Sequence, residues 1–312
     1  MRGTSEYSFS LISAAVATIC AIGILIATGM VVPRKVWLTG AITPAVLFAL
    51  HLYYARVRRD QRLELLAGSM ALLLWSAATC AIIAHAGMRL RRPLVDDILA
   101  SADLAIGIDT PRLVMAFAGH PLLGTLLYAI YLSAVPAVLI TVLLLSLAGK
   151  ASRLWEVIFG YCSGLLICAL ASVAWPALAN FVHAGIKPEQ THGLPTSAGV
   201  FFLDSVRYYR DGYNPIVDPH YFDGVVTFPS FHTIMALIVA YACRGTLLSG
   251  LAYFWAAVLI ISTVPIGGHY VVDLWAGSLL WTVCIYFGRG HQTQLSVGAV
   301  DSSLVSPSDH HV

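Results

Sequence analysis

Eight mostly apolar stretches recur along the chain, each close to the length of roughly 20 residues that a helix needs to cross a membrane. Of the 312 residues, 58% are hydrophobic and 11% are charged, whereas a soluble domain has about 25% charged residues. We therefore predict an all-α fold, a polytopic membrane helix bundle with about eight transmembrane helices. The predicted spans cover residues 10–32, 36–54, 63–85, 121–147, 155–178, 229–248, 250–266 and 270–287.

Two longer stretches interrupt the apolar pattern. Residues 86–120 have apolar positions spaced as in short amphipathic helices at a membrane interface, and residues 179–228 are aromatic and polar. With eight crossings, both stretches and the loop before His269 fall on one face. The short loops 56–62 and 149–153 on the other face are basic, which is typical of the cytoplasmic side. We therefore predict that both termini are cytoplasmic and that the interrupting stretches face the other side.

The chain divides into three parts by composition. Residues 1–88 are predicted to form N-terminal transmembrane helices, residues 89–288 a second membrane domain, and residues 289–312 a polar, disordered cytoplasmic tail. The net charge is +2 with sparse charges, so a nucleic-acid partner is not expected. The six cysteines lie in apolar segments without a CxxC pair, which argues against a disulfide framework and a zinc site. No histidines have the spacing of metal ligands, so no metal or other cofactor is predicted.

His269 and Asp273 stand at the start of the last apolar stretch, in GGHYVVDLWAG. Their i,i+4 spacing puts both on one helix face, about 6 Å apart along the axis. The carboxylate can then accept the imidazole Nδ1–H and leave Nε2 free to attack, as in the base, nucleophile and acid arrangements of many enzymes. The alternative is a structural ion pair at a helix end.

The upstream stretch VVTFPSFHTIMA carries a second histidine, 37 residues before the first. Pro229 suits the first turn of a helix, so Ser230 and His232 are predicted to lie at a helix N-terminus, where free N–H groups attract anions. Ser230 is thus a candidate phosphate ligand, and His232 is placed to protonate a leaving oxygen. Gly268, with Gly267, lets the backbone approach a ligand closely.

FPSFH and GGHYVVD together resemble the second and third motifs of the type 2 phosphatidic acid phosphatase superfamily. The similarity is closer to its inositolphosphotransferase-like branch, which includes inositol phosphorylceramide synthases. It is clearest over residues 200–280 and looser from residue 91 onward. The resemblance implies a six-helix catalytic core within the second domain and a metal-independent His–His–Asp triad. It also implies that His269 is the nucleophile or base, that Asp273 orients it, and that His232 is the general acid.

The sequence departs from the phosphatase pattern of this superfamily in two places. The Ser-Arg pair expected seven and six residues before the motif histidine reads Ser262 and Thr263, so one phosphate-binding arginine is missing. The first motif, a Lys and then Arg-Pro after six residues, has only the partial match HAGMRLRRP, which begins with His85. A phosphodiester has one charge and needs fewer cations than a monoester dianion. The missing arginine therefore favours transfer of a phospho-headgroup between lipids.

Three arginines are candidate replacements for the missing phosphate ligand. Arg210, which with Gly212 matches an Arg-x-Gly common in similar sequences, is the favoured clamp, because a guanidinium can hold two oxygens. Arg207 and Arg92 are further candidates. The alternatives are a basic patch at the headgroup level, paired with neighbouring aspartates, and snorkelling of interfacial arginines.

Other functions remain open at this stage. The same residues suit a lipid phosphate phosphatase acting on phosphatidate or a polyprenyl phosphate or diphosphate, since water can replace the acceptor alcohol. A lipid transporter would carry ionisable residues in mid-span, where this chain has few. A vanadate-type haloperoxidase relies on the missing arginine. The expected partners are thus the bilayer and a phospholipid or lipid-phosphate substrate, with tail, headgroup and oligomeric state left open.

Overall fold

The chain folds as a helix bundle, as predicted. The computed structural model describes the backbone of residues 4–303 and the side chains of residues 5–287. Over this range the structure contains helices and one isolated bridge but no β-strand. The α-helices are α1 Thr4–Thr28, α2 Arg34–Tyr53, α3 Gln61–Gly87, α4 Asp96–Ala105, α5 Thr110–Ala118, α6 Pro121–Leu132, α7 Ala134–Leu147, α8 Ala151–Ala174, α9 Asn180–His183, α10 Leu203–Val206, α11 Phe231–Cys243, α12 Ser249–Ser262 and α13 Val271–Ser303. The shorter turns are η1 Tyr54–Arg58, η2 Met88–Leu90, η3 Pro188–Gln190, η4 Arg207–Asp211 and η5 Pro219–Tyr221.

All eight predicted spans contain apolar helices, but the helices differ in length. Four are long and apolar enough to cross a membrane, namely Ser5–Thr28, Arg34–Arg58, Gln61–Leu90 and Ala151–Ala174. The predicted span 121–147 is divided at Ser133 into α6 and α7. Pro136 has no N–H to donate to the carbonyl of Leu132, which accounts for a helix break at this point. Helices α7, α11 and α12 and the apolar part of α13 have 10–17 residues each.

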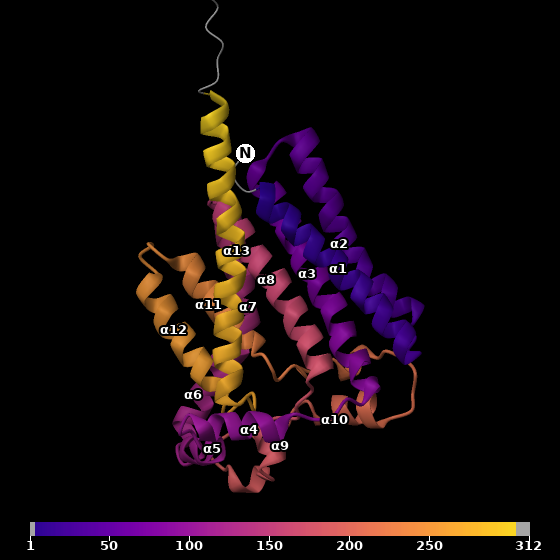
Figure 1. The fold of residues 1–312 in the computed structure, drawn as a ribbon, viewed down its shortest axis with the longest axis vertical. Helices are drawn as coiled ribbons and strands as arrows, with labels where there is room; N and C mark the ends of the chain where they lie inside the picture. Colours follow the sequence, from indigo (N-terminus) through magenta and orange to yellow (C-terminus); the bar gives the residue numbers. More distant parts are fainter. Residues whose placement is uncertain (1–3, 304–312) are drawn as a thin grey trace, which may run out of the picture.

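The bundle is arranged around α8. Helices α1, α2 and α3 pack side by side on one side of it, and the α11–α12 hairpin lies on the other, with α13 beside it (Figure 1). Two glycines of α8 allow close packing: a Cβ on Gly160 would lie 2.4 Å from the Trp281 ring, and one on Gly164 would lie 3.2 Å from Ile234. Helices α4, α5 and α9 lie across one end of the bundle (Figure 1). Of these, α4 and α5 fall within residues 86–120, where amphipathic helices were predicted.

The polar loop before α11, within residues 179–228, contacts the N-terminal part of the chain. Val31, between α1 and α2, forms a parallel bridge with Ile216. The guanidinium of Arg89 donates hydrogen bonds to the carbonyls of residues 212–214 at 2.7–3.1 Å, and Arg91 donates to the carbonyl of Arg210 at 2.8 Å. In the predicted topology both arginines lie on the face opposite the short basic loops. Their hydrogen bonds hold the polar loop before α11 in place.

Helix α13 is longer than the predicted span. It continues to Ser303, so residues 289–303 of the segment that was predicted to be disordered are helical. Extension of an existing helix adds one hydrogen bond per residue without a new nucleation step, and no proline occurs between Val271 and Pro307. Residues 304–312 of that tail lie outside the described part of the chain.

Candidate active site

Helix α11 begins at the serine of the FPSFH motif. Ser230 is the N-cap residue, and its side chain accepts a hydrogen bond from the N–H of Thr233 at 3.4 Å. Because α11 starts at Phe231, Pro229 lies before the cap rather than in the first turn, which corrects the predicted helix start by two residues. The prediction that Ser230 and His232 lie at a helix N-terminus is confirmed.

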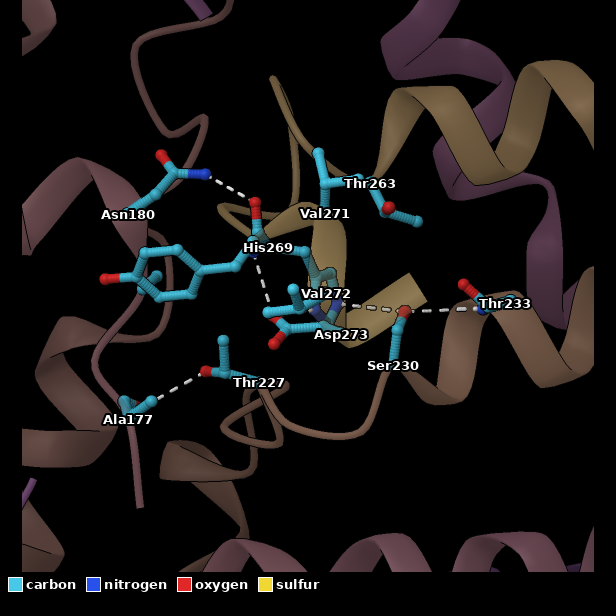
Figure 2. A network of polar contacts seen from close by, with 12 residues as sticks. Ala177, Asn180, Thr227, Ser230, Thr233, Thr263, His269, Val271, Val272 and Asp273 are labelled. Atoms are coloured by element: carbon cyan, nitrogen blue, oxygen red, sulfur yellow. Dashed lines mark hydrogen bonds and ion pairs between the residues drawn. The ribbon is translucent and has the colours of Figure 1, made fainter. Parts of the chain in front are cut away.

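His269 and Asp273 form the predicted contact. Nδ1 of His269 lies 3.2 Å from Oδ2 of Asp273, and Nε2 lies 3.4 Å from Oγ of Ser230 (Figure 2). Asp273 is fully buried and His269 nearly so. The same carboxylate oxygen accepts the N–H of Tyr270 at 2.9 Å. Serine, imidazole and carboxylate are thus aligned so that a proton or charge on the ring is balanced by a fixed carboxylate.

The backbone of His269 is held from the opposite side by α9. The side-chain amide of Asn180 donates to the carbonyl of His269, and the N–H of Asn180 donates to the carbonyl of Gly268 at 2.9 Å (Figure 2). Gly268 has a φ of +78°, and a Cβ there would lie 2.9 Å from the Cβ of Ala179. A side chain at position 268 would therefore displace the histidine or the loop against it.

Two buried carboxylates of α4 support the start of α13. Asp103 accepts the N–H groups of Val271 and Val272 at 2.9 and 2.8 Å and also the hydroxyl of Thr110. N–H groups in the first turn of a helix lack intrahelical partners, so Asp103 acts as a cap supplied from another helix. The capping role of Asp103 is not evident from the sequence, because VDDILASAD has the pattern of the polar face of an interfacial helix.

Asp96, at the start of the same helix, also accepts hydrogen bonds from distant parts of the chain. It accepts the N–H groups of Leu178 and Ala179 and the hydroxyl of Tyr270, all at 3.0 Å. Ala179 has a φ of +106°, a conformation that residues with a Cβ rarely adopt. Strain of this kind persists only where the surrounding structure holds it. Asp96 therefore fixes both the residue after the motif histidine and the loop that packs on Gly268.

Helix α13 packs directly on the cap of α11. A Cβ on Gly277, one turn beyond Asp273, would lie 2.5 Å from the carbonyl oxygen of Ser230 and 3.2 Å from Cβ of Thr233. In addition, the N–H of Ser230 donates to the carbonyl of Asp273 at 3.1 Å. The two motifs are thus held together by backbone contact, which only a glycine at position 277 permits.

His232 and His269 face a common cavity of about 230 Å³. Their ring centroids are 6.3 Å apart, and His232 is stacked on Tyr131 with centroids 4.3 Å apart. The rest of the wall is mostly apolar and includes His85, whose two ring nitrogens contact backbone carbonyls. In the sequence, His85 stands out only as the first residue of the partial motif match HAGMRLRRP, and nothing there connects it with the histidine pair.

Burial sets the charge of the motif histidine. The loss of hydration lowers the pKa of His269 to about 4, against an opposing contribution from a hydrogen bond with the backbone of Thr227. The imidazole is therefore neutral at physiological pH, and an electron pair on its outer nitrogen is available for attack.

The three candidate arginines lie outside this cavity. Arg207 is exposed and pairs with Asp204 at 2.9 Å, and Arg92 is exposed. Arg210 donates to the carbonyl of Arg92 at 2.9 Å, while its Nη1 is buried without a hydrogen-bond partner. Arg210 borders a small gap whose walls include Ala84 and Val225, which also line the histidine cavity. Arg210 is thus separated from the histidine cavity by side chains that line both spaces.

Comparison with known proteins decides the family. The model of the PAP2 superfamily matches residues 97–287, from α4 through the apolar part of α13. The chain belongs to the PAP2 superfamily. No curated protein and no solved structure matches it. Membership indicates an enzyme of the lipid phosphatase or phosphotransferase type, and the matched region leaves out α1, α2 and α3. Within the described residues no group of three or more His, Cys, Asp or Glu side chains is arranged to hold a metal ion.

Proposed function

We propose that this PAP2 superfamily protein transfers a phospho-headgroup between lipids through a phosphohistidine at His269. The observation that carries the proposal is the buried alignment of Ser230, His269 and Asp273 beside His232. Within the superfamily, this activity would place the protein in the inositolphosphotransferase-like branch. Release of phosphate from a lipid monoester, with water as the acceptor, is the second candidate.

In the first step, Nε2 of His269 attacks phosphorus and forms a P–N bond while the P–O bond to the leaving alcohol breaks. His232 gives its proton to the leaving oxygen; the anionic phosphate favours the protonated form of a nearby imidazole. In the second step an acceptor hydroxyl attacks phosphorus, His232 takes back a proton, and the P–N bond breaks. Asp273 stabilises the charge that develops on the ring of His269 throughout.

Two features support a diester over a monoester substrate. Thr263 occupies the position of the superfamily arginine and is buried, with its hydroxyl bonded to the carbonyl of Ile260. None of the residues that line the histidine cavity within the described chain is a lysine or arginine. A monoester dianion would find little compensation for its second charge there, because burial of an unpaired charge is costly. We further propose that Ser230 contacts the phosphate and that Arg210, whose Nη1 has no hydrogen-bond partner, reaches it only when the side chains between the two spaces move.

The proposal places the active site on the non-cytoplasmic face and both termini in the cytoplasm. It rests on the basic short loops and on the common face shared by α4, α5 and the polar loop. Arg207 and Arg92, both exposed, are proposed to attract the headgroup at the mouth of the site rather than to grip the reacting phosphate. The catalytic unit is proposed to be residues 89–288, with residues 1–88 as an accessory helical unit.

The test uses purified protein in detergent with two substrate mixtures. One contains labelled phosphatidic acid or polyprenyl diphosphate, and the other contains phosphatidylinositol with a lipid alcohol. Wild type and His269→Ala are compared, and both free phosphate and new phospholipid are measured. New phospholipid from the second mixture, lost in the variant, supports transfer. Free phosphate from the first mixture alone would instead support the phosphatase, and activity that survives in the variant would remove His269 from the mechanism.

The covalent step has its own chemical signature. Phosphohistidine is labile to acid and stable to alkali, and phosphoserine behaves oppositely. We expect label trapped on the wild-type protein from the first half-reaction to be lost in acid. Acid-stable label on Ser230, which lies 3.4 Å from Nε2 of His269, would instead make the serine the nucleophile and the histidine its base.

A further inference from the structure

A second cavity lies between α2 and α3, at the end of the bundle that holds the histidine pair. Its volume is about 440 Å³, larger than the histidine cavity, and its walls are largely apolar. Trp37 and Gly40 of α2 lie on one side and Ala78 of α3 on the other, with Pro219 and Phe222 of the polar loop over it. We refer to this space as the α2–α3 groove.

The groove and the histidine cavity adjoin each other. Ala77, Ala81 and Phe222 line both. The two alanines are one helical turn apart on the same face of α3, and His85 is the next residue on that face. Their side chains are methyl groups, so α3 forms a thin partition between the groove and the space in front of His269. A flexible chain that starts at the histidine pair would pass over these small side chains to enter the groove.

We propose that the α2–α3 groove holds a hydrocarbon chain of the lipid whose phosphoester is presented to His269. The inference rests on the proposed function. A chain that runs from the groove over Ala77 and Ala81 places its polar end between the two histidines, where only a headgroup bearing the reacting bond is useful. Helices α2 and α3 lie outside the part of the chain that the superfamily model matches, so this protein adds its own wall to the shared catalytic core.

The bilayer surrounding such a groove is itself apolar. Moving a chain from lipid into the groove therefore gains little from the hydrophobic effect, and shape and packing decide what fits. The expected consequence is discrimination among lipid tails rather than tight binding. The appropriate measurement is the ratio of kcat/KM for two substrates that share a headgroup and differ in tail length.

The groove can be filled without disturbing the backbone. Gly40 lines the groove, and a Cβ built on it meets no atom within 4 Å, so Gly40→Phe adds a ring at the groove wall without a backbone clash and also improves helix propensity. Gly23 on α1 is likewise helical and has no atom within 4 Å of an added Cβ, and it is exposed outside the groove. Gly23→Phe is therefore the matched control.

We expect Gly40→Phe to lower the ratio for dioleoyl relative to dioctanoyl substrate by roughly 10-fold, the scale on which apolar pockets discriminate. In Gly40→Phe, activity on the dioctanoyl substrate and the thermal unfolding midpoint should stay near wild type. In Gly23→Phe, the ratio, the dioctanoyl activity and the midpoint should all stay near wild type. Ala81→Trp, at the partition, should shift the ratio in the same direction. An unchanged ratio in Gly40→Phe, or an equal loss for both substrates, would mean that ordinary membrane lipid fills the groove and would overturn the proposal.

A second readout does not depend on turnover. A phosphatidate with a photoactivatable diazirine at the end of one chain is crosslinked to the protein, and the labelled peptides are mapped. The proposal requires labelling of residues 36–41 and 75–82 that excess unmodified phosphatidate and Gly40→Phe both abolish. Uniform labelling of lipid-facing helices, including α1 near Gly23, would contradict it. Specific groove labelling in a protein that turns over no phosphoester would retain the groove and reject the proposed reaction.

Discussion

Asp273 is a fully buried carboxylate in contact with His269. One carboxylate oxygen contacts Nδ1 of His269 and the N–H of Tyr270, while the other is buried without a partner. Asp273→Asn keeps the shape but offers an amide that selects the wrong tautomer of the ring. We expect kcat to fall by about 10⁴-fold with little change in KM or in the thermal unfolding midpoint. A loss below tenfold, measured by initial rates, would show that the carboxylate is only structural.

The pKa of His269 makes a second prediction at the residue scale. Burial lowers it to about 4 from an ordinary value near 6.5, so the ring loses its proton at lower pH and is the neutral nucleophile above about pH 4. With a diester substrate, which stays a monoanion, protonation of His269 should therefore cause no loss of kcat/KM between about pH 7 and about pH 5. Enzyme held at each pH and returned to pH 7 serves as the control for denaturation. An acid limb near pH 6.5 would contradict the buried, neutral histidine.

At the scale of elements, the site depends on caps that come from other helices. Asp103→Ala leaves the N–H groups of Val271 and Val272 without their acceptor, which costs about 1–2 kcal/mol, and it loosens the segment that holds His269. We expect a lower unfolding midpoint and at least a tenfold lower kcat, with partial rescue by Asp103→Asn. Asp97→Ala is the control, since the Asp97 side chain on the same helix is 93% exposed. Equal effects of both alanine variants would reject the capping role.

The contact between α11 and α13 is a second prediction at this scale. Gly277→Ala places a methyl group 2.5 Å from the carbonyl oxygen of Ser230, so the two motifs must separate. Activity should be lost even though alanine favours the helix by about 1 kcal/mol. Gly250→Ala on α12, where an added Cβ meets no atom within 4 Å, should be neutral or stabilising. Full activity in Gly277→Ala would show that the motifs tolerate wider spacing.

What the sequence could predict at the element scale follows from where each signal lies. FPSFH and GGHYVVD each carry their chemistry within a few residues, and the convergence of Ser230, His269 and His232 was predictable from helix starts on one face. Asp103 and Asn180 act on backbone groups far along the chain, and their residue types alone do not reveal this. Arg207 was a reasonable candidate by position, but its pairing with Asp204 in solvent depends on how η4 is oriented.

At the scale of the whole molecule, hydropathy predicted the bundle and the eight stretches that contain its apolar helices, but not the lengths of those helices. The break at Ser133 lies within apolar sequence, so composition alone does not mark it. The α11–α12 turn contains Arg244, Gly245 and Thr246, and the predicted spans 229–248 and 250–266 already divide close to it. The ends of the bundle are nonetheless distinct. Both described ends of the chain and the α11–α12 turn lie away from α4, α5 and α9 (Figure 1), which places every feature of the site at one end.

Because the site lies at one end of the bundle, two exposed positions at opposite ends should react differently with a membrane-impermeant reagent. Thr246 lies in the α11–α12 turn, and Glu189 lies in η3 at the site end; both are exposed, whereas the native cysteines are buried or half-buried. In a background with serine or alanine at the native cysteines, Glu189→Cys should react with a membrane-impermeant maleimide added to intact cells. Thr246→Cys should react only after permeabilisation, because the short basic loops keep its end in the cytoplasm. The reverse pattern would retain the bundle and move the active site to the cytoplasmic face, and labelling of both positions before permeabilisation would contradict a membrane between them.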